Sequence, residues 1–115
     1  MNSTIETIFA NFSVGGVVIP VKFLRYNGKS DTYITYCETD KNNSLFGDDG
    51  CEGYVSYYDF DIFSKGNYTT IVSEVKRLMK ENGFTWQPSR DSEDMYEDET
   101  KLYHKTLSFA KEQGE

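Results

Sequence analysis

The segment GYVSYYDFDIFS, residues 53–64, alternates between apolar and polar side chains, and this alternation constrains the fold more than any other feature. An extended chain points successive side chains to opposite faces of a sheet. One face then carries large apolar side chains and the other carries two carboxylates: Tyr58, Phe60 and Ile62 against Asp59 and Asp61. The segment DTYITYCE, residues 31–38, alternates in the same way. We therefore predict two strands that pair as a hairpin with a long, exposed tip.

The N-terminal segment STIETIFANF, residues 3–12, has the period of an amphipathic helix. Its apolar side chains recur at i, i+3, i+4 and i+7: Ile5, Ile8, Phe9 and Phe12. Ser3 followed by Glu6 fits a capping box, in which each side chain bonds to the other residue's backbone N–H. Gly15 and Gly16 are expected to end this helix.

A second helix is predicted within residues 64–84. Its apolar stripe is formed by Ile71, Val72, Val75, Leu78 and Met79. Asn67 is a suitable N-cap residue, because its side chain can accept a hydrogen bond from the first turn. Asn82 and Gly83 form a strong signal for the C-terminal end.

Three further segments are expected to be extended. The first, VVIPVKFLRY (17–26), is an irregular or edge strand, because Pro20 cannot donate to a central ladder. FTWQ (84–87) is a short extended segment, and KLYHKTLSFAKE (101–112) is the final strand. The expected fold is a single α+β domain over residues 1–115, with an antiparallel sheet, two main helices and the order α-β-β-β-α-β-β.

The net charge of −7 is unevenly distributed along the chain. Residues 38–61 hold seven acidic side chains against Lys41 alone, and residues 91–99 hold six with no base. Such a chain has no broad basic surface for gripping phosphates, so it is expected to repel DNA or to attract a basic protein surface. No apolar run is long enough to span a membrane, and no secretory signal is recognisable at the N-terminus. We therefore expect a cytosolic protein.

The stretch YCETDKNNSLFGDDGCEG, residues 36–53, places acidic and amide side chains at intervals that suggest a calcium loop. In a register that starts at Asp40, however, Leu45 stands where the loop needs glycine and Cys51 stands where it needs a bidentate glutamate. We therefore expect no calcium site. Cys37 and Cys51 are expected to be thiols rather than a disulfide, because the cytosol is reducing.

No set of residues predicts a catalytic centre, and we expect no metal and no cofactor. His104 is the only histidine, and its parity in the final strand places it opposite Tyr103, Leu107 and Phe109, on the outward face. Asp59 and Asp61 are expected to form a solvated face. An enzyme would require a cleft that groups His104 with Cys37, Cys51 or a pair of carboxylates.

Three segments together resemble a known family: DTYITY (31–36), FDIFSKGNYTTIVSEVKRLMKENGF (60–84) and MYEDETKLYHKTLSF (95–109). A strand ending in SKGNY, an amphipathic helix and a Y-E-D-E-T-x-x-Y-H-K-x-x-x-F hairpin are similar to the tail-completion, or tail-terminator, proteins of long-tailed phages and prophages of Gram-positive bacteria. The resemblance covers roughly residues 17–110. This sequence departs from the family pattern mainly at the paired glycines and in the loop 39–52.

The resemblance implies a structural protein rather than an enzyme. It implies a ring, expected to be a hexamer, that caps the tail tube and joins it to the head-completion protein, with DNA passing through without specific binding. The isolated chain is expected to be a monomer, located in the host cytoplasm during assembly and then at the head–tail interface of the virion. The alternative from the residues alone is a small acidic binding module, such as an antagonist that mimics nucleic-acid phosphates.

Leu45 and Phe46, rimmed by Asp48 and Asp49, form an apolar pair in the acidic tip and are the candidate assembly contacts. The alternative is that both fold back onto the strands as a small satellite cluster. If they are exposed contacts, replacing both with serine should leave the melting temperature nearly unchanged, because surface substitutions seldom exceed about 0.5 kcal/mol.

The same substitution should impair assembly, measured as ring formation or head–tail joining. A loss of several kcal/mol would instead place the pair in the core. Unchanged stability with normal assembly would remove any role for the pair.

Overall fold

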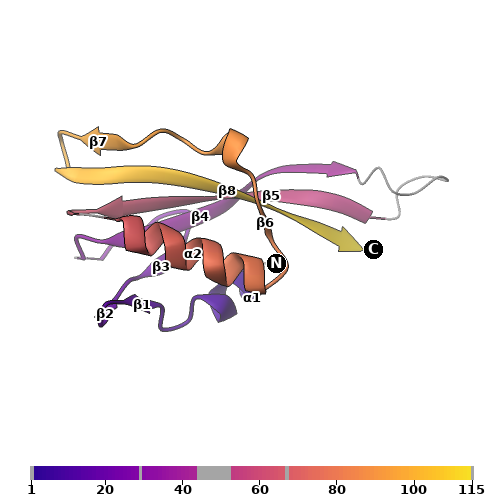
Figure 1. Cartoon of the computed structure of the whole chain (residues 1–115), viewed down its shortest axis with the longest axis horizontal. Coiled ribbons are helices and arrows are strands. Elements are labelled where there is room, and N and C mark those ends of the chain that lie inside the picture. Colours follow the sequence, from indigo (N-terminus) through magenta and orange to yellow (C-terminus); the bar gives the residue numbers. More distant parts are fainter. Residues whose placement is uncertain (1, 29, 44–52, 67, 115) are drawn as a thin grey trace.

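A computed structural model describes residues 2–28, 30–43, 53–66 and 68–114 of the chain (Figure 1). The fold is α+β, with one mixed sheet that is mostly antiparallel. The elements, in chain order, are α1 (Asn2–Ile8), β1 (Ser13–Val14), β2 (Val17–Val18), β3 (Val21–Phe23), β4 (Tyr33–Asn43), β5 (Gly53–Ser64), α2 (Thr69–Glu81), β6 (Thr85–Trp86), the 3-10 turn η1 (Pro88–Arg90), β7 (Met95–Glu97) and β8 (Leu102–Gly114).

The main sheet has the order β3-β4-β5-β8, with β6 and β7 both paired to the outer side of β8. The predicted hairpin is confirmed, because β4 and β5 pair antiparallel from Tyr33 opposite Phe63 to Asn43 opposite Tyr54. The expectation of a purely antiparallel sheet was wrong, because β3 runs parallel to β4. After Phe23 the chain leaves the sheet at Leu24, whose φ is 67°, and re-enters it at Tyr33. This detour lets both strands run in the same direction.

The structure contains one substantial helix rather than the two that were predicted. The first, α1, has only seven residues and begins at Asn2, so Ser3 lies inside it and not at an N-cap. It ends at Ile8 because the chain turns through Asn11, which has a left-handed φ of 59°. The predicted apolar face is nevertheless buried, since Ile5, Phe9 and Phe12 belong to the core.

Gly15 and Gly16 do not end a helix but form the two-residue turn between β1 and β2. Their φ angles are 60° and 83°. Two successive positive φ angles define the type I′ turn, whose twist suits a tight hairpin and which glycine adopts without steric cost.

The second helix is close to its prediction. Its buried stripe contains Ile71, Val75 and Met79, although Tyr68 rather than Asn67 occupies the N-cap position. At the C-terminal end Gly83 has a φ of 87°. The Phe84 N–H donates to the Met79 carbonyl at 2.9 Å and the Gly83 N–H donates to the Lys80 carbonyl at 3.1 Å. These two bonds form a Schellman motif, and the burial of Phe84 and Met79 supplies its apolar contact.

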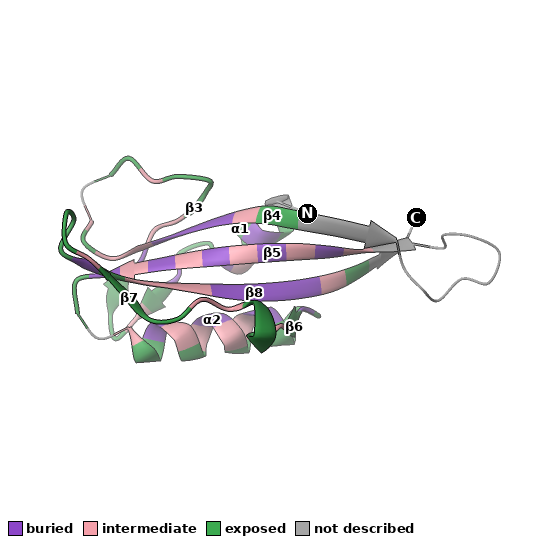
Figure 2. Ribbon diagram, turned by 90° about the horizontal axis from the view of Figure 1, so that it is seen from above, coloured by how far each residue is buried: buried purple, intermediate pink, exposed green. Residues whose placement is uncertain are grey.

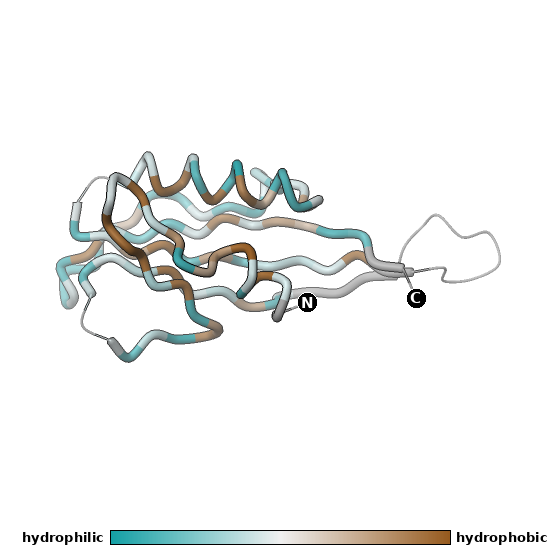
Figure 3. The backbone as a smooth tube through the Cα atoms, turned by 90° about the horizontal axis from the view of Figure 1, so that it is seen from below, coloured by the Kyte–Doolittle hydropathy of each residue, from teal (hydrophilic) through white to brown (hydrophobic). Residues whose placement is uncertain are grey.

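The core lies between one face of the sheet and both helices (Figures 2 and 3). It contains Ile34 and Tyr36 of β4, Tyr58, Phe60 and Ile62 of β5, and Leu107 and Phe109 of β8. In Figure 3 the apolar positions of α2 recur on the side that faces the strands. Within the described residues, no helix is both long and apolar enough to cross a membrane. The strands β4, β5 and β8 extend beyond the helices along the long axis of the molecule (Figure 1).

Phe60 is the centre of this core and the best test of it. Its side chain is fully buried, and its ring lies 5.5 Å from Phe9, 5.5 Å from Tyr36 and 5.6 Å from Phe109. Phe60→Ala should therefore lower the free energy of unfolding by about 3–5 kcal/mol, measured by urea denaturation. Ser73→Ala, on the exposed side of α2, is the control and should change it by less than about 0.5 kcal/mol. A loss below about 1 kcal/mol for Phe60→Ala would contradict the assigned packing.

Candidate functional site

The predicted assembly contacts Leu45, Phe46, Asp48 and Asp49 lie outside the described residues, and so does Cys51. The elements that flank this segment are strands, since β4 ends at Asn43 and β5 begins at Gly53. An EF-hand requires helices at these places. The flanking elements therefore agree with the rejection of that motif.

The face of the sheet opposite the helices carries an aromatic row that crosses three strands. Tyr33, Phe63 and His104 are neighbours in the register of β4, β5 and β8. The Phe63 ring stacks on Tyr33 at 4.7 Å and on the His104 imidazole at 4.2 Å. Tyr26 extends the row, with its ring 4.7 Å from Tyr33. Stacked rings of this kind stabilise neighbouring strands by contact area and by offset stacking.

His104 lies on this second face, as its parity predicted, but it is half-buried and bonded rather than free. Its Nε2 lies 3.0 Å from Asp61 Oδ1, and its Nδ1 lies 3.3 Å from Glu97 Oε2. The Thr106 hydroxyl also donates to Asp61 Oδ1 at 2.6 Å. The structure therefore brings together the sole histidine and two carboxylates from three different strands.

Asp59 forms the next row of the same face. The Ser108 hydroxyl donates to Asp59 Oδ1 at 2.5 Å, and the Ser108 N–H donates to Asp91 Oδ1 at 2.9 Å. Arg90 covers this part of the face, with its guanidinium carbon 4.1 Å from the centre of the Tyr57 ring. The expectation of a simply solvated carboxylate pair was therefore wrong. Asp59 and Asp61 lie on one face as predicted, but both are half-buried and hydrogen-bonded.

Cys37 is a free thiol beside Asp59 in the register of β4 and β5. Burial, followed by the nearby charges of Asp59 and Asp61, raises the pKa of the Cys37 thiol. His104 is level with Tyr33 rather than with Cys37, and it lies two strands away. The raised pKa disfavours the thiolate, and the register separates the thiol from the imidazole. Nucleophilic catalysis by a cysteine commonly uses a thiolate next to a base, and this arrangement provides neither.

Among the described residues, no group of three or more His, Cys, Asp and Glu side chains is arranged to hold a metal ion. The cluster around His104 has the chemistry of a hydrogen-bonded brace between strands, because His104 and Thr106 of β8 both contact Asp61 of β5, and His104 also contacts Glu97 of β7.

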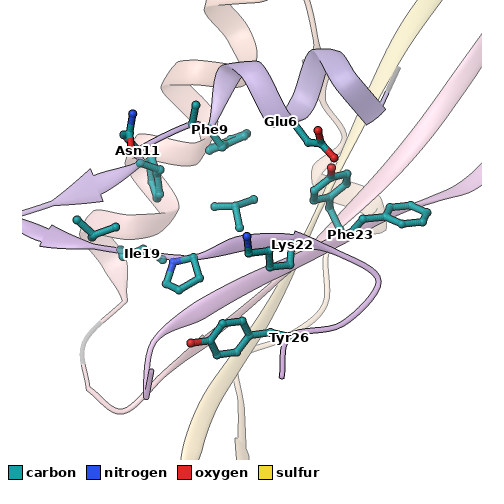
Figure 4. A pocket seen from close by; sticks show the side chains of 13 residues that line it. Glu6, Phe9, Asn11, Ile19, Lys22, Phe23 and Tyr26 are labelled. Carbon is teal, nitrogen blue, oxygen red and sulfur yellow. The ribbon is translucent and has the colours of Figure 1, made fainter. Parts of the chain in front are cut away.

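A second feature is a groove between α1 and β3, with a volume of about 600 Å³ (Figure 4). Its wall is mixed: Phe9, Phe12, Ile19 and Phe23 supply apolar surface, and Glu6, Asn11, Lys22, Tyr26 and Tyr36 supply polar groups. Burial, and secondarily the Glu6 carboxylate, raises the pKa of Tyr36 in this wall. The neutral phenol is thus favoured in a groove that offers both apolar surface and hydrogen-bonding groups.

Lys22 and Phe23 line this groove, and residues 22–25 are named here the basic edge. Phe23 and Leu24 are 44% and 62% exposed. Lys22 and Arg25 are exposed as well, and within the described residues neither is within ion-pair distance of a carboxylate. The basic edge therefore combines apolar area with unneutralised positive charge.

Residues 93–99, at the opposite side of the sheet, are named here the acidic edge. Met95 and Tyr96 are 40% and 48% exposed, and Tyr96 packs against Tyr103 with ring centroids 5.0 Å apart. Tyr68 donates a hydrogen bond to Asp94. Burial, together with this bond, raises the pKa of Tyr68 to about 12. The bond in turn lowers the pKa of Asp94.

Sequence reasoning missed both edges as sites. A signal was present at the basic edge, because Pro20 marks an edge strand and residues 17–30 contain Lys22, Arg25 and Lys29 without a carboxylate. At the acidic edge, Met95 and Tyr96 interrupt an acidic run of which only the charge was used. Which apolar residues of short strands remain exposed depends on the tertiary fold, so the pattern alone did not reveal it.

Comparison with known proteins does not assign a family to this chain. No protein-family model matches the sequence, and a search of curated proteins finds no match.

The raised pKa of Cys37 predicts its reactivity. At about pH 8 its alkylation by iodoacetamide should be slower than that of an unfolded peptide, because less thiolate is present. Asp59→Asn should partly restore the rate, since it removes a negative charge and keeps an oxygen acceptor for Ser108. Mass spectrometry of the tryptic peptide 30–41, which contains Cys37 and not Cys51, measures both rates. Asp98→Asn is the control and should leave the rate unchanged, and equal rates in native protein and peptide would contradict the prediction.

Proposed function

We propose that the chain is a structural subunit of a phage tail, of the tail-completion kind, that assembles into a ring with other copies. The observation that carries this proposal is that apolar side chains are exposed at both edges of the sheet. Phe23 and Leu24 are exposed at one edge, and Met95 and Tyr96 are exposed at the other. Exposed apolar side chains with polar surroundings are typical of protein–protein contacts. A subunit with two unlike contact edges suits a closed ring.

The segments that resemble tail-completion proteins also support the proposal. Residues 31–36 enter β4, residues 60–84 run from β5 through α2, and residues 95–109 form the β7–β8 hairpin. These elements are direct neighbours in the sheet and its covering layer. The resemblance therefore falls on one contiguous structural unit rather than on scattered pieces.

In this proposal the ring is a hexamer that caps the tail tube and contacts the head-completion protein, and DNA passes through it. The net charge of −7 fits a channel that duplex DNA crosses without adhering, because like charges repel. The protein acts in the host cytoplasm during assembly and then at the head–tail interface of the virion. The isolated chain is a monomer at micromolar concentration and closes into rings at high concentration or on the tail tube.

The alternative function, an acidic antagonist that mimics nucleic-acid phosphates, fits the same surface less well. A mimic of nucleic-acid phosphates needs exposed carboxylates in one continuous row. Asp59 and Asp61 are instead half-buried and bonded to Ser108, Thr106 and His104. This use of the central acids favours a structural role over mimicry.

The proposal is tested by deletion of the gene from the phage or prophage that carries it. Full heads and separate tails should then accumulate, as seen by electron microscopy, and a plasmid copy should restore joined virions. Light scattering after size exclusion should give a monomer for the purified chain. Normal virions from the deletion strain would overturn the proposal, and a stable two-fold dimer would count heavily against the ring.

A further inference from the structure

We infer that copies of this chain join head to tail, with the basic edge of one copy docked on the acidic edge of the next. This inference rests on the proposed function and deepens it, because it assigns the two surfaces that meet in the ring. The two edges lie on opposite sides of the same sheet, with β3 on one side and β7 on the other (Figure 2).

The first argument is charge complementarity. Lys22 and Arg25 of the basic edge are exposed and have no carboxylate partner among the described residues. At the acidic edge, Glu93 and Glu99 are exposed and, within the same part of the chain, have no basic partner. Each edge repels a second copy of itself and attracts the other edge. Such complementarity selects the partner and its register more than it adds affinity.

The second argument is the apolar area that accompanies these charges. At the basic edge Phe23 lines the groove, which offers about 600 Å³ between α1 and β3, and Leu24, the next residue, is exposed. Met95 and Tyr96 project at the acidic edge. An aromatic side chain with a polar group, such as tyrosine, is a suitable occupant for a groove of mixed polarity, and aromatic residues and methionine are enriched at the centres of interfaces.

Leu24 provides a third argument, because its backbone is strained where its side chain is exposed. The Arg25 N–H donates to the Phe23 carbonyl at 2.8 Å, and Leu24 between them has a φ of 67°. A turn of this kind is rare for a large side chain. Leucine gains nothing locally there, since Asn or Gly fits the angle better. An apolar contact with another molecule accounts for leucine at this position.

The strand directions also suit the contact. β3 is parallel to β4, β4 and β8 are each antiparallel to β5, and β7 is antiparallel to β8. It follows that β3 and β7 run in opposite directions within one copy. When a second copy stands beside the first in the same orientation, β3 meets the neighbouring β7 side as an antiparallel strand. Antiparallel addition to a free strand edge is a common mode of recognition.

The register shows how the two edges can be brought level. Lys22 lies beside Thr35, Thr35 lies opposite Asp61, and Asp61 lies opposite Thr106. The Ser92 N–H donates to the Thr106 carbonyl at 3.0 Å. A purely sideways displacement of one copy brings Lys22 level with Ser92, next to Glu93, whereas β7 pairs with residues 102–104, three positions further along β8. A further shift of three residues along the strands brings β3 level with β7 and places Phe23 opposite Met95.

The test mixes two chains that each lack one working edge. Lys22→Glu with Arg25→Glu blocks the basic edge, and Glu93→Lys with Glu99→Lys blocks the acidic edge. At about 1 mM and low salt, neither blocked chain alone should show concentration-dependent NMR shifts. In the mixture, we expect the NMR signals of residues 22–25 and of the groove to shift when the isotope-labelled chain is the one with the blocked acidic edge. With the labels exchanged, shifts should appear at residues 93–99.

The unmodified chain should show both sets of shifts, weakened as added salt screens the charges. A chain with all four substitutions should associate again, because both charges are reversed together, whereas either pair alone should weaken association at least about tenfold. The inference is overturned by shifts at the same edge of both chains, by shifts elsewhere, or by a wild-type chain without concentration-dependent shifts at about 1 mM.

The variant Leu24→Asn distinguishes the loss of the contact between copies from a loss of folding. Asparagine tolerates a positive φ and is polar, so the melting temperature should be retained or raised while the shifts at both edges are lost. Val17→Thr is the matched control, because Val17 is 60% exposed but lies outside both edges, and association should persist. Retained association in Leu24→Asn would remove the apolar part of the contact.

The two proposals fail separately. If gene deletion prevents head–tail joining but the mixed chains do not interact through these edges, the ring uses other surfaces. If the mixed chains interact as described but deletion leaves virions normal, the edge contact exists and the tail-completion function is wrong.

Discussion

Strand β5 pairs with β4 on one side and with β8 on the other, and these two ladders place every other part of the fold. Alternate residues of β5 serve different purposes, because Phe60 enters the aromatic core while Asp61 bonds sideways to Thr106. A slip of one residue would exchange the aromatic ring with the carboxylate. The register is therefore fixed twice, once by apolar burial and once by charge-assisted hydrogen bonds.

The same alternation explains why the face without helices remains ordered. A fully buried carboxylate is costly unless paired, and a fully exposed one contributes little to the free energy of folding. Asp61, with 30% side-chain exposure, lies between these limits and accepts bonds from neighbouring strands. The stack of Tyr33, Phe63 and His104 adds apolar contact to this face. The second face is thus held together without a covering helix, which leaves the sheet thin and both edges accessible.

The parts that sequence reasoning predicted are those determined by local period. The β4–β5 hairpin and α2 with its end at Gly83 follow from periods of 2 and 3.6 and from the helix C-cap. The parallel β3 and the short α1 did not follow, because they depend on the left-handed turns at Leu24 and Asn11, and nothing in neighbouring residues requires such angles. The role of Asp61 was also missed, since its partners are 43 and 45 positions away in sequence. Long-range contacts of this kind leave no trace in a local pattern.

Exposed sheet edges usually invite uncontrolled pairing, and short or charged edge strands restrict it. Here β3 and β7 have three residues each, so backbone pairing alone is too limited to hold two copies. Opposite charges at the two edges disfavour pairs related by a two-fold axis and favour the head-to-tail contact. The net charge of −7 opposes the accumulation of copies, because they repel one another at long range. A weak, directional contact between mutually repelling copies needs a template to hold them together, and a tail tube is such a template in the proposed ring. The features that protect the monomer from aggregation are then the ones that make assembly conditional.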